Sequence, residues 1–359
     1  MRLTWLEVRD FRNHRETSLE VPDGVVVAVG PNAQGKTNLL EAAHYLLTLS
    51  SPRSSSDQPL VRAGSDQAYL RGEVETETGR VLVEVEVRVR GANRMQVNRS
   101  SVRRKRDLRQ RVRSVMSVPE DLSLIQGQPE DRRRFLDESV VALWPAEEAA
   151  RVAYDRALRQ RNRLLKEHEG LEAPADLDAW DAELARHGAA VTAARREAAD
   201  RVAPGASDEF AAVSGDRLNV SYVPSVEGSG DLEEAMRRRL VERRADELVR
   251  RTTLVGPHRD ELELAVEDLA ARRFASHGES WAGALCLRLG ISGAVGAEIG
   301  DPPVLVLDDP FSGLDPVRRR RLAERLFGRG QVLISVPDEA QVPPGATVWE
   351  VSEGHVRPR

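Results

Sequence analysis

The pattern of hydrophobic and polar positions divides the chain into a strand-rich start, a helical middle and a strand-rich end. Residues 25–29 form a continuous apolar run, which is typical of a strand buried on both faces. Hydrophobic and polar residues alternate over 69–89 around Thr78-Gly79, which predicts an antiparallel hairpin with one solvated face. A second apolar run covers 303–307. We therefore expect an α/β fold in which a mixed sheet and an antiparallel lobe are split in sequence by a helical insertion.

Shorter patterns add further elements to this outline. Five apolar residues after the first run recur at helical spacing and predict a helix over 38–47: Leu39, Leu40, Ala43, Leu46 and Leu47. A turn over 126–129 precedes a helix that starts near Pro129. Other helices are expected over 231–251 and 318–327. The remaining strands are expected over 3–8, 18–21, 218–223, 252–256, 262–266 and, as the last strand, 331–335.

The helical middle predicts a short arm. Residues 146 to about 202 are alanine-rich, and a break at 170–174 divides them into two helices that would pack as an antiparallel pair. Helices of about 25–30 residues span only about 40 Å, so we expect an arm and not a long coiled coil. The predicted domains are the first part of the head at 1–112, the arm at 113–251 and the second part of the head at 252–359.

A glycine-rich loop joins the first buried strand to the helix that follows it. Residues 30–37 (GPNAQGKT) fit the pattern G-x-x-x-x-G-K-[ST], and the strand–loop–helix context is the one that this phosphate-binding pattern requires. The loop N–H groups and the helix N-terminus form an anion site, Lys36 reaches the β- and γ-phosphates, and the Thr37 hydroxyl ligates Mg²⁺. The expected nucleotide contacts are Gly30, Asn32, Ala33, Gln34, Gly35, Lys36, Thr37 and Asn38.

Two carboxylates follow the second apolar run. Asp308 stands where a buried strand carries a Mg²⁺-directed aspartate, held to the metal through water. Asp309 is placed to orient or activate the attacking water. These motifs predict ATP and Mg²⁺ as ligands and ATP hydrolysis as the reaction.

A Ser-x-Gly pattern precedes the apolar helix that leads to this strand. Ser276 and Gly278 offer a hydroxyl, backbone N–H groups and a helix dipole to an anion. An ordinary helix N-cap has the same sequence, so the pattern gains value mainly from its place just upstream of the two carboxylates.

Charge and cysteine content limit the partners and the compartment. The net charge is −5 over 359 residues, so any DNA binding requires a local basic patch. Residues 88–113 carry eleven basic side chains and one acidic side chain, Asp107. This strip is either plain solvated surface or a phosphate-backbone contact. Its candidate DNA-binding residues are Arg103, Arg104, Lys105, Arg106 and Arg109.

The sequence also predicts a cytoplasmic protein. Cys286 is the only cysteine, so no disulfide forms within the chain, as suits a reducing compartment. The N-terminus lacks an apolar signal region, and no apolar run is expected to reach membrane-spanning length.

The order of these motifs resembles the ABC-type ATPases of the SMC/Rad50 branch, and within it the RecF family. The resemblance extends over nearly the whole chain and is carried by the stretches 11–13 (FRN), 35–42 (GKTNLLEA), 119–122 (PEDL), 132–137 (RRRFLD), 256–260 (GPHRD), 274–276 (FAS) and 307–312 (LDDPFS).

The resemblance implies roles for further residues. Gln126 would sense Mg²⁺ and the γ-phosphate, and Arg12 and Asn13 would lie near the nucleotide. Ser276 and Gly278 would contact the γ-phosphate of a second subunit, with Asp315 across the same interface. It implies a homodimer that closes on ATP and on duplex DNA near single-strand junctions, hydrolyses ATP slowly, and assists recombinase loading in gap repair with RecR and RecO.

Some positions depart from the family pattern. His277 and Glu279 stand where glutamine is usual, Ala33 replaces a glycine, and His14 replaces a tyrosine. A carboxylate at Glu279 is unfavourable near a γ-phosphate unless it turns away. No histidine follows the strand 331–335 as an ABC-type switch.

Two other functions stay open at this point. A DNA-end ATPase of the Rad50 type would need a longer coiled coil. A phosphate-loop kinase or ATPase that does not bind DNA would need neither the Ser-x-Gly pattern nor the basic strip.

Overall fold

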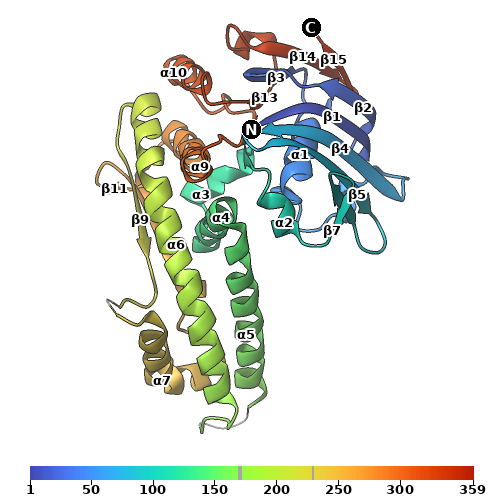
Figure 1. The fold of residues 1–359 in the computed structure, drawn as a ribbon. Helices are drawn as coiled ribbons and strands as arrows, with labels where there is room; N and C mark the ends of the chain where they lie inside the picture. Colours follow the sequence, from blue (N-terminus) through green and yellow to red (C-terminus); the bar gives the residue numbers. More distant parts are fainter. Residues whose placement is uncertain (169–171, 229) are drawn as a thin grey trace.

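The computed structural model describes residues 1–168, 172–228 and 230–359 as a head built on two sheets and an elongated helical arm (Figure 1). The first sheet has the order β15-β14-β3-β13-β12-β8, and all its neighbours are parallel except β15, which is antiparallel to β14. Its strands are β3 (Val25–Val29), β8 (Ser114–Ser117), β12 (Val304–Asp308), β13 (Val332–Val336), β14 (Thr347–Ser352) and β15 (His355–Pro358). The prediction that 331–335 is the last strand is wrong, because β14 and β15 follow it.

The second sheet is antiparallel and has the order β2-β1-β4-β5-β6-β7. It contains the predicted hairpin as β4 and β5, paired from Gln67 with Arg88 to Thr76 with Gly79. Its strands are β1 (Arg2–Phe11), β2 (His14–Glu20), β4 (Gln67–Thr76), β5 (Gly79–Arg88), β6 (Arg94–Val97) and β7 (Ser100–Val102).

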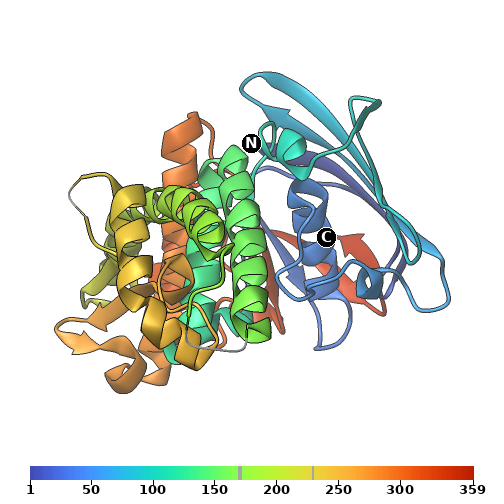
Figure 2. The same ribbon diagram turned by 90° about the horizontal axis from the view of Figure 1, so that it is seen from below.

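Helix α1 (Lys36–Thr48) lies between the two sheets (Figure 2). Its apolar side chains share one core with Val26 and Ala28 of β3, whereas Val25, Val27 and Val29 face the opposite core with α9 (His277–Ile299) and α6 (Leu177–Ser214). The alternation follows from the two-residue period of a strand. A strand covered by helices on both faces has no solvated side, which is why residues 25–29 are all apolar.

The remaining helices connect these layers. They are the α-helices α2 (Lys105–Arg109), α3 (Ser123–Gln126), α4 (Pro129–Leu143), α8 (Ala271–Phe274) and α10 (Pro316–Leu326), and the 3₁₀ turns η1 (Gln58–Leu60), η2 (Pro119–Leu122), η3 (Pro145–Glu147), η4 (Pro257–Arg259) and η5 (Glu339–Gln341).

The arm consists of α5 (Glu148–Glu167), α6 and α7 (Leu232–Arg250). Helices α5 and α6 pack side by side, as predicted, and part of the predicted break at 170–174 lies outside the described residues. Helix α6 has 38 residues, or about 57 Å, and so exceeds the predicted length. It continues past 202 through Pro204 to pack on α9 in the head.

The predicted strand at 252–256 is absent, since these described residues have no strand pairing. Side-chain contacts hold this segment instead. The fully buried Arg161 of α5 donates to Asp181 of α6, to Glu247 of α7 and to the Thr253 hydroxyl, at 2.6, 2.6 and 2.9 Å. A buried guanidinium needs all these partners, and satisfying it fixes the loop to the arm.

Strand pairing crosses the predicted domain boundaries in two places. Strand β8 lies in the parallel sheet of the head, although it falls within the predicted arm at 113–251. Strands β10 (Glu261–Val266) and β11 (Leu269–Ala270) form a three-stranded sheet with β9 (Leu218–Val223), although 252–359 was expected to belong to the head. The second lobe is therefore built from both sides of the residue-251 boundary.

One helix has the length and composition of a membrane span, contrary to the expectation from the sequence. It is α9, with a mean hydropathy of 1.3. Within that stretch 67% of the residues are buried in the protein, where α9 packs against α6 and the parallel sheet. Burial inside the core accounts for its apolar composition.

Two buried histidines, His14 and His44, and the half-buried His258 predict a loss of stability in mild acid. Burial lowers the pKa of His14, lowers that of His44 to about 3 and lowers that of His258 to about 4. Below pH 6.5 the unfolded chain therefore binds more protons than the folded chain. The free energy of unfolding, which is highest above that pH, falls as the pH falls. Each of His44 and His258 should cost about 2 kcal/mol of unfolding free energy between pH 7 and pH 5.

The measurement is denaturant unfolding of wild type and His44→Gln at both pH values. The variant should show a smaller difference between them, and the exposed-site control His355→Gln should not. Equal stability of the wild type at pH 7 and pH 5 would contradict the account.

Candidate active site

The phosphate loop has a positive backbone φ at three positions. Gly35 has φ 112°, Ala33 has φ 64°, and Gly30 has φ 157°, close to the extended limit. A Cβ at Gly35 would lie 2.6 Å from Asn13 Nδ2, so this position requires glycine for both space and conformation. Ala33 tolerates a conformation that the family usually gives to glycine, at some cost in strain.

Lys36, Thr37 and Asp308 meet at the carboxyl ends of the parallel strands. Lys36 Nζ donates to the carbonyl oxygens of Gly30 and Pro31 at 2.6 and 2.8 Å. Burial lowers the pKa of Lys36, and the carboxylates of Asp308 and Asp309 act against that shift. The Thr37 hydroxyl donates to Asp308 Oδ1 at 2.8 Å. Two of the three predicted metal-directed residues, Thr37 and Asp308, are thus in contact although they are 271 positions apart in the chain.

A hydroxyl–carboxylate pair of this kind fits Mg²⁺. This ion keeps several waters and takes few protein oxygens, with phosphate oxygens completing its shell. The described residues contain no cluster of three or more His, Cys, Asp or Glu side chains with metal-ligand spacing. Thr37 and Asp308 would therefore hold Mg²⁺ only together with a nucleotide, and the bound ion would supply charge neutralisation at the phosphates.

Asp309 has the environment of a reactive carboxylate. Its backbone adopts φ 48°, which is unusual for a residue with a side chain. Its Oδ1 atom is buried and has no hydrogen-bond partner. Burial, and next the charge of Asp308, raise the pKa of Asp309. A strained residue with an unsatisfied oxygen and a raised pKa is suited to accept a proton from water.

Ser335 is a positioning residue that the sequence did not indicate. Its hydroxyl donates to Asp308 Oδ1 at 2.5 Å and accepts from the backbone N–H of Asp309 at 2.9 Å. It stands on β13, between the phosphate-loop strand β3 and the carboxylate strand β12.

The C-terminal hairpin supports the phosphate loop, which the sequence analysis also missed. The backbone N–H of Gly354, in the turn between β14 and β15, donates to the Gln34 carbonyl at 2.9 Å. The N–H of Glu353 donates to Gln34 Oε1 at 2.8 Å. His14 lies 3.0 Å from the Gly35 carbonyl and 2.9 Å from that of Gly354. In the sequence, the signal for this support was limited to a glycine, Gly354, which forms the hairpin turn with positive φ.

Arg12 and Asn13 lie beside the loop. Asn13 Nδ2 donates to the Gln34 carbonyl at 3.2 Å, and its Oδ1 accepts from Asn38 at 2.8 Å. Arg12 forms a bidentate pair with the buried Glu41, at 2.9 and 2.7 Å. Glu41 is one helical turn past Thr37, so Arg12 is fixed at the entrance of the loop. Contact with a nucleotide stays a prediction for both residues.

A second group of predicted residues gathers away from the phosphate loop. Ser276 caps α9, and Asp315 caps α10 by accepting from the N–H groups of Val317 and Arg318 at 2.9 and 3.0 Å. A Cβ on Gly278 would lie 2.9 Å from the Arg318 guanidinium. Across the described residues, no hydrogen bond joins this group to residues 30–38. The role of this group as a second phosphate contact stays a prediction.

Comparisons with known proteins identify the family. The family model for the RecF/RecN/SMC N terminal domain matches residues 2–354. The DNA replication and repair protein RecF of Streptomyces avermitilis is 44% identical and is covered over 99% of both chains. RecF of Acidothermus cellulolyticus is 43% identical, over 99% of this chain and 100% of the relative. The chain belongs to the RecF family.

Solved structures agree with this assignment. A structure of the recombination mediator protein RecF with ATP, from the RecFOR pathway, matches with a TM-score of 0.89 and 28% identity, over 99% of this chain and 97% of the other. The Smc head domain of Pyrococcus yayanosii, at 14% identity, matches with a TM-score of 0.61 over 99% of this chain and 96% of the other, and shows the fold alone. The predicted fold, an ABC-type ATPase head with a helical insertion, is confirmed, and this RecF-family chain is an ATPase.

One departure from the RecF-family pattern has a structural explanation. Glu279 Oε2 accepts from the Ser276 N–H at 2.7 Å, while the Ser276 hydroxyl accepts from the Glu279 N–H at 3.3 Å. This reciprocal capping box satisfies two N–H groups at the start of α9. The carboxylate is therefore engaged at the helix terminus, where the helix dipole stabilises negative charge.

Other predicted residues are placed but not tested. Gln126 is exposed at the end of α3, and its role as a sensor of Mg²⁺ and the γ-phosphate stays a prediction. Arg109 does not fit a DNA contact. It is buried, donates to the Thr48 carbonyl at 2.7 Å and pairs with Glu148 at 3.0 Å. Its guanidinium joins the head to the arm, which its position in a basic run could not indicate.

The environment of Asp309 predicts how hydrolysis depends on this residue and on pH. Asp309→Asn should lower the ATP turnover by about 100-fold or more, since a general base contributes at least that much, and should leave ATP affinity nearly unchanged. Because the pKa of Asp309 is raised, the acidic limb of the wild-type pH–rate profile should lie above the ordinary aspartate range.

Steady-state hydrolysis and equilibrium binding of a fluorescent ATP analogue measure these two quantities. Asp338→Asn, at an exposed position after β13, is the matched control. Wild-type turnover in Asp309→Asn would exclude Asp309 as the base.

Proposed function

We propose that this protein is an ATP-dependent DNA clamp that acts in recombinational repair of gaps. The single observation that supports the proposal is that, among the described residues, no hydrogen bond joins the Ser276–Gly278 group to the phosphate loop. The Lys36–Thr37–Asp308 group can hold the phosphates and Mg²⁺. We infer that the Ser276–Gly278 group, next to Arg318, completes the site from a second copy.

ATP then acts as the ligand that joins two subunits. Two nucleotides lie between the phosphate loop of one protomer and the start of α9 of the other, in an isologous dimer. Each ATP binds the closed dimer better than the open state, so binding favours closure by mass action. Slow hydrolysis, with Asp309 as the base, removes the γ-phosphate and returns the dimer to the open state.

The family comparison supports DNA repair as the setting. The relatives bear the name DNA replication and repair protein, and the similar solved structures are of a recombination mediator in the RecFOR pathway. We extend this to duplex DNA near single-strand junctions as the substrate, with RecR and RecO as partners in recombinase loading. A Rad50-type end-processing role is less suitable, because α5 and α6 form an arm of 20 and 38 residues rather than a long coiled coil.

Sedimentation velocity tests the ATP-linked dimer. Wild type with ATP and Mg²⁺ should shift from monomer towards dimer. Asp309→Asn should accumulate more dimer because it binds ATP and hydrolyses it slowly, and Lys36→Met should stay monomeric because it loses a charge at the phosphates. Monomers of both wild type and Asp309→Asn, with ATP and with ATP plus duplex DNA, would contradict the clamp.

The exposed part of the basic strip predicts a DNA contact. Arg103 and Arg104 are exposed and have no acidic partner within 4.0 Å in the described residues. Lys105 and Arg106 are partly engaged, with the Leu49 carbonyl at 2.6 Å and Asp107 at 3.5 Å. Reversing both free arginines to glutamate should weaken duplex binding and reduce the slope of log affinity against log salt by about 2.

Fluorescence anisotropy over a salt series provides the measurement. The same reversal at Arg237 and Arg238, exposed on α7 of the arm, is the charge-matched control. An equal effect of the two pairs would mean that only net charge matters and that 103–104 is plain surface.

A further inference from the structure

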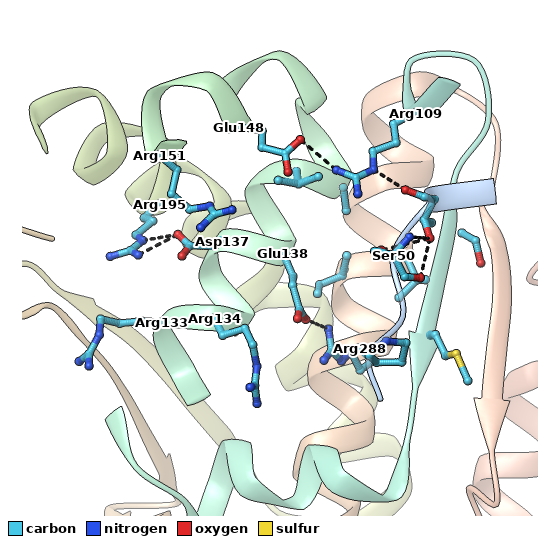
Figure 3. A pocket seen from close by; sticks show the side chains of 18 of the residues that line it. Ser50, Arg109, Arg133, Arg134, Asp137, Glu138, Glu148, Arg151, Arg195 and Arg288 are labelled. Carbon is cyan, nitrogen blue, oxygen red and sulfur yellow. Dashed lines mark hydrogen bonds and ion pairs between the residues drawn. The ribbon is translucent and has the colours of Figure 1, made fainter. Parts of the chain in front are cut away.

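A cavity of about 620 Å³ lies between the head and the arm (Figure 3). Its head side is formed by the end of α1, by the residue 50–52 loop and by β8 with the residues before it. Its arm side is formed by α4, α5 and α6. Thr48, which lines it, is twelve residues along α1 from Lys36, or roughly 18 Å. The cavity is therefore separate from the nucleotide site.

Most of the charged side chains that line the cavity are already paired. Figure 3 shows Arg109 directed to Glu148, Arg195 to Asp137 and Arg288 to Glu138. These pairs have N···O distances of 3.0, 2.8 and 2.6 Å. Arg151 is 3.1 Å from Asp155. Arg195 also lies 3.4 Å from Asp260 and Arg288 lies 2.6 Å from Asp121, so each of these four cations has at least one carboxylate partner.

Arg113 is a buried cation without such a partner. Its exposed fraction is 7%, and no described carboxylate lies within 4.0 Å of its guanidinium. Its hydrogen bonds go to the carbonyl oxygens of Ala142 and Val112, at 3.1 and 3.3 Å. Burial, together with the neighbouring charge of Arg109, lowers its pKa to about 10. Carbonyl oxygens do not neutralise a charge, so this arginine destabilises the protein when no anion is near.

Arg133 is a second lining cation that lacks a carboxylate partner among the described residues. It donates to the Asp260 carbonyl at 3.0 Å, and Figure 3 shows it on the same side of the cavity as Arg134, with the two side chains pointing in different directions. Arg134 is exposed and pairs with Asp131 at 3.0 Å. The one lining carboxylate outside the four pairs is Glu130, which is exposed. Arg113 and Arg133, one from each lobe, are thus the lining arginines without a carboxylate within 4.0 Å among the described residues.

Neutral hydrogen-bonding groups also line the cavity. His44 lies 3.0 Å from the Ser114 hydroxyl, and the low pKa of His44 keeps its imidazole uncharged near neutral pH. Thr48 and Ser50 add two more hydroxyls to the head side of the lining. Guanidinium groups with nearby hydroxyls are the donors that recognise phosphate oxygens.

We propose that this cavity is a second phosphate-binding site, in which Arg113 from the head and Arg133 from the arm bind phosphate oxygens of the same ligand. A volume of 620 Å³ lies within the usual range for small-molecule sites, so the phosphate belongs either to a free nucleotide-sized compound or to a segment of DNA backbone that enters the cleft. A ligand held by both lobes favours whichever lobe arrangement brings the two arginines together.

The first experiment measures the melting temperature of the full chain with inorganic pyrophosphate. Pyrophosphate also binds phosphate loops, so the comparison uses the Lys36→Met background, which weakens that site. In this background, saturating pyrophosphate should raise the melting temperature by about 2–4 °C. The added variant Arg113→Met should abolish the rise, whereas Arg111→Met, an exposed neighbour, should retain it.

The variant without ligand separates a binding role from a structural one. Because the buried charge of Arg113 is unpaired, Arg113→Met should melt at the same or a higher temperature than its parent in the absence of anions. If Arg113 only supports the fold, the variant melts lower and the proposal is overturned. Arg133→Met, at a less buried position, provides a second test, since it should also remove the pyrophosphate effect without unfolding the chain.

A second arm identifies the source of the phosphate. If the site takes DNA backbone, Arg113→Met also lowers the affinity for a 30-base-pair duplex and lowers its salt slope by about 1, while Arg111→Met does neither. If the site takes a free phosphate compound, DNA affinity is unchanged and the pyrophosphate effect depends on Arg113. If Arg113→Met and Arg133→Met both retain the pyrophosphate stabilisation and the duplex affinity of their parent, the proposal is overturned.

Discussion

The hydroxyl of Ser335 makes the two hydrogen bonds on which the active site depends. It binds the Asp308 carboxylate at 2.5 Å and the Asp309 backbone N–H at 2.9 Å, from a strand that lies between the phosphate-loop strand and the carboxylate strand. Asp308 in turn accepts from Thr37 at 2.8 Å. Three parallel strands are thereby joined at their carboxyl ends, where the order β3-β13-β12 brings together residues that are distant in sequence. Asp309, which has a strained backbone and a raised pKa, follows directly after the carboxylate strand that these bonds hold.

The start of α9 and the start of α10 lie close to each other, since a Cβ on Gly278 would be 2.9 Å from the Arg318 guanidinium. The Ser276–Glu279 capping box and the Asp315 cap satisfy their own helix termini, so neither needs the phosphate loop to be stable. In the proposed dimer, the nucleotide would bridge two subunits, and its hydrolysis would let them separate. The pair of Arg109 with Glu148 joins the head to the arm.

The sequence predicted those parts whose pattern is local. The loop at 30–37, the buried strands and the β4–β5 hairpin follow from glycine spacing and hydrophobic period, and the structure confirms them. It could not predict contacts that tertiary packing creates. Ser335 looks like any strand residue, the Gly354 turn is distant from the loop that it supports, and Arg109 appears in a basic run although it is buried. The strand expected at 252–256 has suitable residues, but Arg161 recruits Thr253 by a side-chain bond instead.

Mixing two inactive variants tests the composite site most directly. Lys36→Met damages the phosphate loop, and Ser276→Arg damages the opposing surface, so each homodimer has two defective sites. A mixed dimer contains one intact pair, in which the loop of the Ser276→Arg protomer meets Ser276 of the Lys36→Met protomer. The account predicts that mixing restores ATP hydrolysis, up to about a quarter of the wild-type rate for random pairing in a two-fold dimer. Hydrolysis no greater than the sum of the two separate variants would contradict a site shared between subunits.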